Sequence, residues 1–189
     1  MNKVSAAKPG VGGGIWAAVD GTTPPSDAST ALSAAFTSLG YVSEDGVSRK
    51  ISRDNKVINA WGGDVVAVVG NKKTETFEFT MIEYSNTDVL GMVFGEATGN
   101  LSDGITVKSK ADISASRVMV ISTILAGNVH QRIVIPKGVI TDVGDISYKD
   151  DDVVAFPVTV TAIADDNGVT AYEYQKTVGS TDTDTDGTD

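Results

Sequence analysis

The sequence contains no cysteine and only one histidine, His130. Without thiols the chain can form neither a disulfide framework nor a thiolate metal site. A Ser-His-Asp triad or a histidine-based metal site would have to use His130, which lies in a strand-like run with no recognisable partner motif. A surface or cross-strand role is therefore favoured for His130. The sequence predicts no catalytic residue, no metal and no other cofactor, and hence no enzyme.

Basic residues and long apolar runs are also scarce. The 189 residues include 15 lysines and arginines against 25 aspartates and glutamates, a formal net charge of −10. Such a chain repels nucleic acid and anionic membranes at long range, so it is unsuited to gripping DNA phosphates but can let DNA slide past. No apolar run approaches the roughly 20 residues of a membrane span. The first ten residues lack the apolar core of a secretory signal, so synthesis in the cytoplasm is expected.

Acidic residues form short clusters at 44–45, 150–152 and 165–166. All three fall in expected turns, where local hydrogen bonding favours Asp and Asn. A glycosidase needs two carboxylates about 5 to 9.5 Å apart across a cleft, and nothing in the pattern supports such a pair. The segment Asp165–Gly168 is faintly similar to a calcium loop, but it lacks the closing glutamate. A turn is the favoured interpretation.

Composition divides the chain into three parts, residues 1–14, 15–176 and 177–189. The first is rich in glycine and small residues and is expected to be an extended arm. The last is a Thr/Asp repeat without apolar residues and is expected to be disordered. The middle part is expected to form one β domain.

This middle part is dominated by β-branched and alternating runs. Phe77, Phe79 and Met81, for example, alternate with polar residues, as in a half-buried antiparallel strand. We expect eight to ten strands and a mostly β, antiparallel sandwich or barrel with one short flanking α-helix. The expected strands are 15–19, 41–42, 65–69, 74–84, 105–109, 117–125, 129–135, 139–148, 152–163 and 169–174. The expected turns are 44–46, 71–73, 126–128, 136–138, 149–151 and 165–168.

One helix is expected between residues 86 and 95. Asn86, Thr87 or Asp88 can cap its N-terminus, and Gly95 is placed to end it. Leu90, Val93 and Phe94 then share one face, suited to packing on the sheet. The earlier segment 31–39 is compatible with either a helical turn or an extended lead-in to a strand.

The stretch from Leu39 to Val66 is long, charged and closed by a single large aromatic residue, Trp61. Between 48 and 59 it is a polar loop in this interpretation, with basic residues interleaved with acidic ones. Two alternatives remain open from the residues alone, a flexible surface loop and an arm that docks on a neighbouring subunit. The charged residues are Arg49, Lys50, Arg53, Asp54 and Lys56.

Several blocks of the sequence, spanning about residues 12 to 175, carry a resemblance to a known family. The blocks are, in order, Gly14–Ala18, Ala31–Gly46, Ala60–Val66, Thr76–Glu83, Asn86–Leu90, Arg132–Gly138 and Asp145–Asp150. Together they resemble the major tail protein, or tail tube protein, of long-tailed, non-contractile phages of the siphophage type.

The resemblance implies a structural subunit of the virion tail. Hexameric rings would stack into a hollow tube that delivers the genome to the host, with strands in an inner barrel and the helix outside. Implied partners are other copies of the chain, the tape measure protein, the tail terminator and distal tail or baseplate proteins. DNA would pass through the lumen without specific binding, and no membrane binding is implied. The contact candidates between subunits or rings are Lys3, Lys8, Trp16, Arg49, Lys50, Arg53, Asp54, Lys56 and Trp61, with Leu90, Val93 and Phe94 packing the outer helix.

The alternative function is a β-sandwich module on a virion or cell surface that binds a carbohydrate or receptor. Such modules expose aromatic residues in loops, and only Trp61 and Trp16 qualify here. If the Trp61 ring is buried, Trp61→Ala should cost about 3 to 5 kcal/mol, and if it is exposed the effect should fall on assembly. Deleting residues 48–59 is expected to leave the domain folded and to stop ring stacking.

Overall fold

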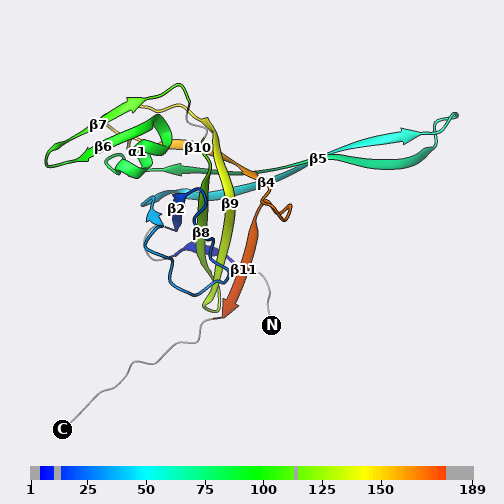
Figure 1. The fold of residues 1–189 in the computed structure, drawn as a ribbon, viewed down its shortest axis with the longest axis horizontal. Coiled ribbons are helices and arrows are strands. Elements are labelled where there is room, and N and C mark those ends of the chain that lie inside the picture. The colour runs from blue at the N-terminus through cyan, green and yellow to red at the C-terminus, as the bar shows by residue number, and fades with distance from the viewer. Residues whose placement is uncertain (1–4, 11–13, 113–114, 178–189) are drawn as a thin grey trace, which may run out of the picture.

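The computed structural model describes residues 5–10, 14–112 and 115–177 (Figure 1). In these ranges a nine-stranded antiparallel sheet has the order β3-β2-β8-β9-β10-β5-β4, with β1 added to β8 and β11 to β9. β6 and β7 form a separate two-stranded sheet, and one short α-helix is present. The elements are β1 (Ala7–Pro9), β2 (Ile15–Val19), β3 (Thr37–Ser38), β4 (Val42–Asn59), β5 (Val65–Met81), α1 (Thr87–Phe94), β6 (Gly95–Asn100), β7 (Gly104–Ser109), β8 (Arg117–Leu125), β9 (Val129–Val143), β10 (Phe156–Ile163) and β11 (Tyr172–Thr177). The predicted class, mostly antiparallel β with one short helix, is confirmed.

β8 lies at the centre of the domain and is buried on both faces. Met119 and Ile121 point into the larger core, whereas Val118 and Val120 point into a smaller one on the other face. Successive residues of a strand face opposite sides, so burial on both sides requires the continuous apolar run found here. The larger core also contains the inward residues of β5 and β10 and the buried face of α1.

The helix forms as the sequence predicted. The Asn86 side chain accepts hydrogen bonds from the backbone N–H groups of Asp88 (3.0 Å) and Val89 (3.4 Å). Gly95 ends the helix with φ of 101°, a backbone conformation that glycine adopts at little cost. Leu90 and Val93 are buried in the larger core, together with neighbouring residues of the same helix.

Replacing the capping residue, Asn86→Ala, should lower the free energy of unfolding by about 1 kcal/mol. The change leaves helix N–H groups without an acceptor and also removes the bond from Asn86 to the carbonyl of Ser38 (3.3 Å). Urea unfolding followed by circular dichroism measures the effect. Asp88→Ala, in the same exposed first turn, is the matched control and should cost clearly less. Equal costs for the two variants would contradict the capping assignment.

The interpretation of residues 48–59 as a loop was wrong, because they belong to β4. β4 pairs with β5 as far as Asn59 opposite Val65, so the two strands form one long hairpin with its turn at 60–64. The outer part of this strand, residues 50–59, is solvated on both faces and has no apolar alternation, which is why its pattern resembles a loop.

Two expected turns inside this hairpin are irregularities of its strands. Val42 and Val47 of β4 oppose Met81 and Phe79, so residues 43–46 bulge out of the ladder. On β5 a register shift occurs where the ladder passes from Lys72 to Gly70, so the expected turn at 71–73 is a bulge as well. Bulges bend a strand and increase its twist without ending it.

Three further expectations change in the sheet. β9 continues through the expected turn at 136–138. Pro136 lies where the partner of β9 changes from β11 to β10, so its missing N–H group breaks no hydrogen bond between these strands. The 165–168 turn is present, but β11 pairs with β9 rather than with β10. The pairing of β9 with β10 is shorter than expected and leaves 144–155 outside the strands. In segment 31–39 the extended lead-in is observed, as a turn at 34–35 followed by β3.

Candidate functional site

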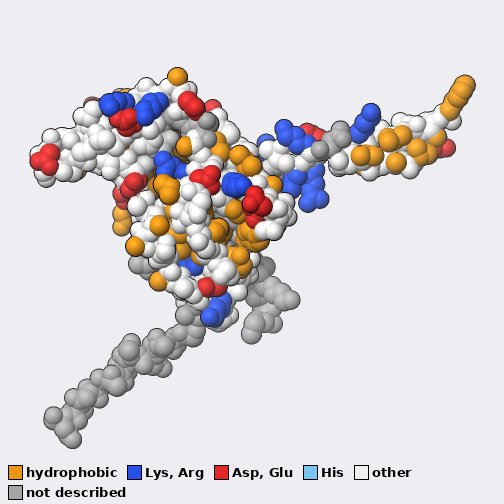
Figure 2. Space-filling model, in the orientation of Figure 1, with side chains coloured by type: hydrophobic (Ala, Val, Ile, Leu, Met, Phe, Trp, Pro, Cys, Tyr) orange, Lys and Arg blue, Asp and Glu red, His pale blue; other side chains and the backbone are white. Residues whose placement is uncertain are grey.

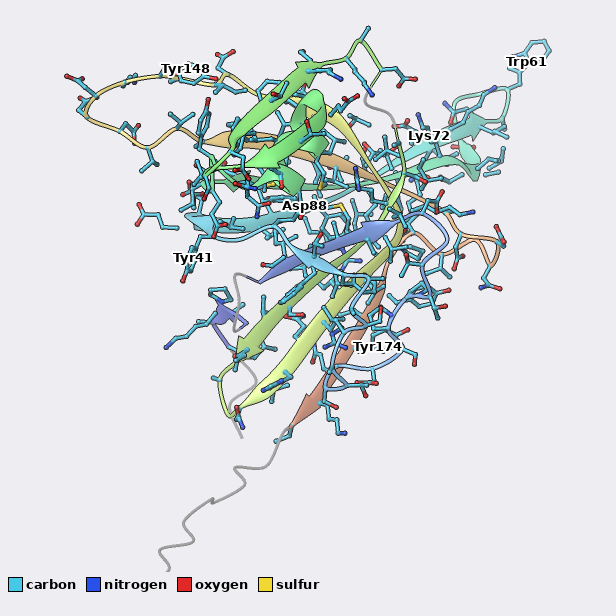
Figure 3. The ribbon with its side chains drawn as sticks, turned by 60° about the vertical axis from the view of Figure 1, so that its left-hand side comes forward. Tyr41, Trp61, Lys72, Asp88, Tyr148 and Tyr174 are labelled. Carbon is cyan, nitrogen blue, oxygen red and sulfur yellow. The ribbon has the colours of Figure 1, made fainter. Side chains whose placement is uncertain are left out.

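The outer part of the β4–β5 hairpin, residues 50–73, extends away from the domain and is called the arm here (Figure 1). Its described side chains are all exposed, and in the described residues β4 pairs only with β5. Trp61 lies at its tip, fully exposed at 107% (Figure 3). Gly62 and Gly63, with φ of 120° and 99°, form the turn beside it.

Apolar side chains cover the outer half of the arm (Figure 2). Cross-strand pairs such as Val57 with Val68 leave apolar groups on both faces of the ribbon in water. An isolated two-stranded hairpin is marginally stable, and an exposed apolar patch marks a surface that binds a partner. The exposed apolar residues of the arm are Ile51, Val57, Ile58, Trp61, Val65, Val66, Val68 and Val69.

Basic side chains gather on the half of the arm nearer the domain (Figure 2). The arm carries five basic residues and two acidic ones, in a chain whose net charge is −10. Its local charge is therefore opposite to that of the protein as a whole, so the arm is attracted to other copies. The basic residues are Lys50, Arg53, Lys56, Lys72 and Lys73, and the acidic ones are Asp54 and Asp64.

A buried carboxylate fixes the root of the arm. Glu75 of β5 has a fully buried side chain and accepts hydrogen bonds from Arg49 Nε (2.6 Å) and from the hydroxyl of Thr170. Lys73 Nζ lies 2.8 Å from Glu75 Oε2. Arg49 also forms an ion pair with Glu173 of β11, at 3.1 Å. Arg49 is thus a structural link between the hairpin and the sheet rather than part of the exposed arm.

The pKa of Glu75 makes this link dependent on pH. Burial acts to raise the pKa, but the hydrogen bonds from Lys73, Thr170 and Arg49 outweigh it, so the pKa lies below its usual value. A lowered pKa in the folded state stabilises the fold at pH values above the ordinary glutamate pKa, about 4.3. That contribution is lost as the pH falls through the lowered pKa.

We therefore expect the difference in unfolding free energy between the native chain and Glu75→Gln to shrink as the pH falls below about 4.3. Urea titrations at a series of pH values measure this difference. Glu78→Gln is the matched control, because Glu78 is an exposed glutamate on the same strand. A difference for Glu75→Gln that stays constant with pH would show that the Glu75 carboxylate does not stabilise the fold.

Besides the apolar and basic parts of the arm, the solvent face of β5, β10 and β9 forms a separate surface that is rich in threonine. The residues on this face alternate with the buried ones, and Thr141 and Thr161 join neighbouring strands by a hydroxyl contact of 2.9 Å. Its charged members Glu78 and Asp142 are acidic and exposed, and Lys137, at the end of the face, is paired with Asp166. This threonine face consists of Thr76, Glu78, Thr80, Val139, Thr141, Asp142, Pro157, Thr159 and Thr161.

The remaining predicted site residues are dispersed. Trp16 is half-buried and packs against the smaller core, so its ring is not a freely exposed contact. Lys8 is exposed on β1, which pairs with β8 of its own chain, and Lys3 lies outside the described residues. Lys50, Arg53, Asp54, Lys56 and Trp61 all lie on the arm.

Nothing in the described residues groups acidic or histidine side chains as a metal site would require. Asp165 instead accepts hydrogen bonds from the backbone of Asn167 and Val169 and from the Tyr172 hydroxyl, as a turn residue does. His130 lies on β9 opposite Ile124 and Lys176. No helix in the described part of the chain is long and apolar enough to cross a membrane.

Sequence reasoning missed two features of the arm. The apolar run 65–69 looked like an ordinary sheet strand, although it lies on the outer half of the arm with its side chains in water. Glu75 was not singled out from the sequence, although its side chain is on the buried side of the strand. The alternation itself could have shown this, since Glu75 shares its face with Phe77 and Phe79.

A β domain that extends a basic and apolar arm into solvent has the features of a structural subunit that assembles with other proteins. Sequence comparison identifies the kind of assembly: the family model described as phage tail tube protein matches residues 1–183, and the chain belongs to that family. It is a structural component of the phage tail, not an enzyme.

Other comparisons are more distant. Among solved structures the chain is similar to the cryo-EM structure of the anti-feeding prophage cap, the tube terminating cap, with 8% sequence identity and a TM-score of 0.43. The match covers 93% of this chain and 97% of the other. A search of curated proteins found no significant match.

Proposed function

We propose that the protein forms hexameric rings that stack into the tail tube of a non-contractile phage. The arm is the observation that carries this proposal, because it leaves eight large apolar side chains in water in the isolated subunit, seven of them on its outer half. Burial of such groups stabilises contacts by roughly 25 cal/mol per Å² of apolar area. Contact with the next ring removes this surface from water, and the sixfold ring follows from the resemblance to siphophage tail proteins.

The threonine face is suited to the channel wall. Threonine hydroxyls offer hydrogen bonds without charge, and the acidic Glu78 and Asp142 repel phosphate. A wall of this composition lets double-stranded DNA slide without holding it, whereas a wall of lysines would bind it with strong salt dependence. The face is opposite the side that packs against α1, so α1 lies on the outside of the tube in this arrangement.

The ends of such a tube require other proteins. We infer from the resemblance that a tape measure protein occupies the lumen during assembly, a terminator closes one end, and a distal tail or baseplate protein closes the other. Residues 1–14, with Lys3 and Lys8, are proposed to add contacts between subunits.

Electron microscopy of the purified protein tests the proposal directly. We expect hollow tubes at high protein concentration, and averaged end-on views with sixfold symmetry. Dilution should dissolve the tubes into smaller species, and analytical ultracentrifugation measures the size of these species. A chain that stays monomeric at all concentrations, and that is not found in purified tails, would overturn the proposal.

A further inference from the structure

A groove of about 680 Å³ opens between the root of β4 and the strands β1, β2 and β8. Ile15, Phe77 and Ile121 form its floor, and each is at most 3% exposed. Its rim includes the exposed residues Glu44 and Asp45 from the bulge of β4. Arg49 also lines the groove, but its charge is paired with Glu75 and Glu173. The groove thus combines an apolar floor with an acidic rim.

The arm of the same chain does not reach this groove. None of residues 50–73 is among the described residues that line it. Tyr41, which also lines the groove, lies on the side of the domain away from Trp61 (Figure 3). An arm that docks in the groove must therefore come from another copy.

We propose that the groove receives the Trp61 tip of the arm of a second copy, an inference that rests on the tube function proposed above. The tip is apolar and matches the apolar floor of the groove, whereas the basic residues lie on the half of the arm nearer its own domain. Tryptophan is among the residues that most often dominate interface energetics when buried in a partner pocket. The basic arm and the acidic chain as a whole attract each other, which favours rapid encounter between copies.

Two other hollows on the domain are less suited to the arm. One, of about 450 Å³, is lined by His130 and the buried Arg132, so a basic arm gains no charge complementarity there. Another, of about 310 Å³, opens on the threonine face and is lined by polar residues such as Glu78 and by apolar ones such as Phe79. The groove is the largest of these three hollows, and three large apolar side chains lie in its floor.

The positions of arm and groove also determine the type of assembly. A tip that docks into a groove on the opposite side of an identical subunit makes a heterologous contact, which repeats along an axis. Repetition without closure produces an open filament. A heterologous contact whose rotation closes produces a ring instead, so the same contact can join copies within a ring or between rings.

Cross-linking tests the contact cleanly, because the chain has no native cysteine. Ala60→Cys places a thiol beside Trp61, and Ala7→Cys places one at the groove, both at exposed alanines. Treating assembled tubes of the double variant with a short bismaleimide should give a ladder of multimers on a denaturing gel. Each single variant can give at most a dimer.

Ala60→Cys combined with Ala164→Cys is the matched control, since Ala164 is exposed and does not line the groove. We expect tubes of this variant without a ladder. The groove assignment would be overturned if tubes of the variant with Ala60→Cys and Ala7→Cys gave no ladder, or if the control variant with Ala164→Cys gave an equal one. Either result would leave the tube function standing. Failure of the native chain to form any tube would instead overturn the tube function.

A second measurement uses Trp61 itself. Trp61→Ala should leave the monomer folded, because the ring is fully exposed, and should raise the critical concentration for tube formation about thirtyfold. Leu101→Ala is the control, since Leu101 is 75% exposed on the turn between β6 and β7 and should leave assembly unchanged. An unchanged critical concentration for Trp61→Ala would overturn the proposed docking of the tip.

Discussion

Replacing residues 54–72 with Asn-Gly should abolish tube formation while leaving a folded monomer. Arg53 and Lys73 already lie opposite each other in the β4–β5 ladder, so a two-residue type I′ turn can join them. The described side chains removed are exposed, and the core loses no contact. We expect an unchanged circular dichroism spectrum, an unfolding free energy within about 1 kcal/mol of the native value, and no tubes in micrographs.

The structure also changes where this deletion must be made. Removing residues 48–59, which the sequence alone favoured, would take away Arg49 and leave Glu75 buried without its arginine. It would also remove most of the β4 strand that pairs with β5, so we now expect that variant to be destabilised. Normal tubes formed by the 54–72 replacement would refute the role of the arm in stacking.

Arg49→Ala should lower the free energy of unfolding by about 3 kcal/mol. Removing one member of a buried ion pair leaves the other charge without its counter-charge, and Glu75 is fully buried. The loss should fall at the low end of the usual range, because Lys73 remains bound to Glu75 and the Arg49 side chain is itself 29% exposed. Arg49 also lies over the ring of Phe77, at 5.5 Å from its centroid.

Arg53→Ala is the matched control for this measurement. Arg53 is an arginine on the same strand, but it lies on the exposed arm. Urea unfolding of the monomer should show little change for Arg53→Ala and a clearly lower midpoint for Arg49→Ala. Equal midpoints for the two variants would show that the Glu75 cluster does not stabilise the root of the arm.

Local patterns predicted the helix and the buried strands well. Asn86 at the N-cap, Gly95 at the end and the 126–128 hairpin were readable because each depends on neighbouring residues only. Strands with one buried face, such as 74–81, were readable from their alternation. Residues 48–59 were not, since a strand in water on both faces carries no period in hydrophobicity.

The candidate site was predictable only in part. Arg49, Lys50, Arg53, Lys56 and Trp61 were singled out from the sequence as charged or aromatic residues of one segment. The sequence did not predict that Arg49 is a structural anchor while the others lie on an exposed arm. Arg49 acquires its role from Glu75 and Glu173, which are distant in the sequence.

The sequence by itself determined the composition-dependent properties of this protein. An acidic, cysteine-free chain of alternating strands is a mostly β domain without thiol chemistry, and its ordered blocks resemble a tail tube protein. Only the tertiary structure decided that the charged stretch is a β-hairpin arm with Trp61 at its tip, fixed at its root by a buried carboxylate. The physical reason is that strand pairing and charge burial are set by partners distant along the chain, which local periodicity does not contain.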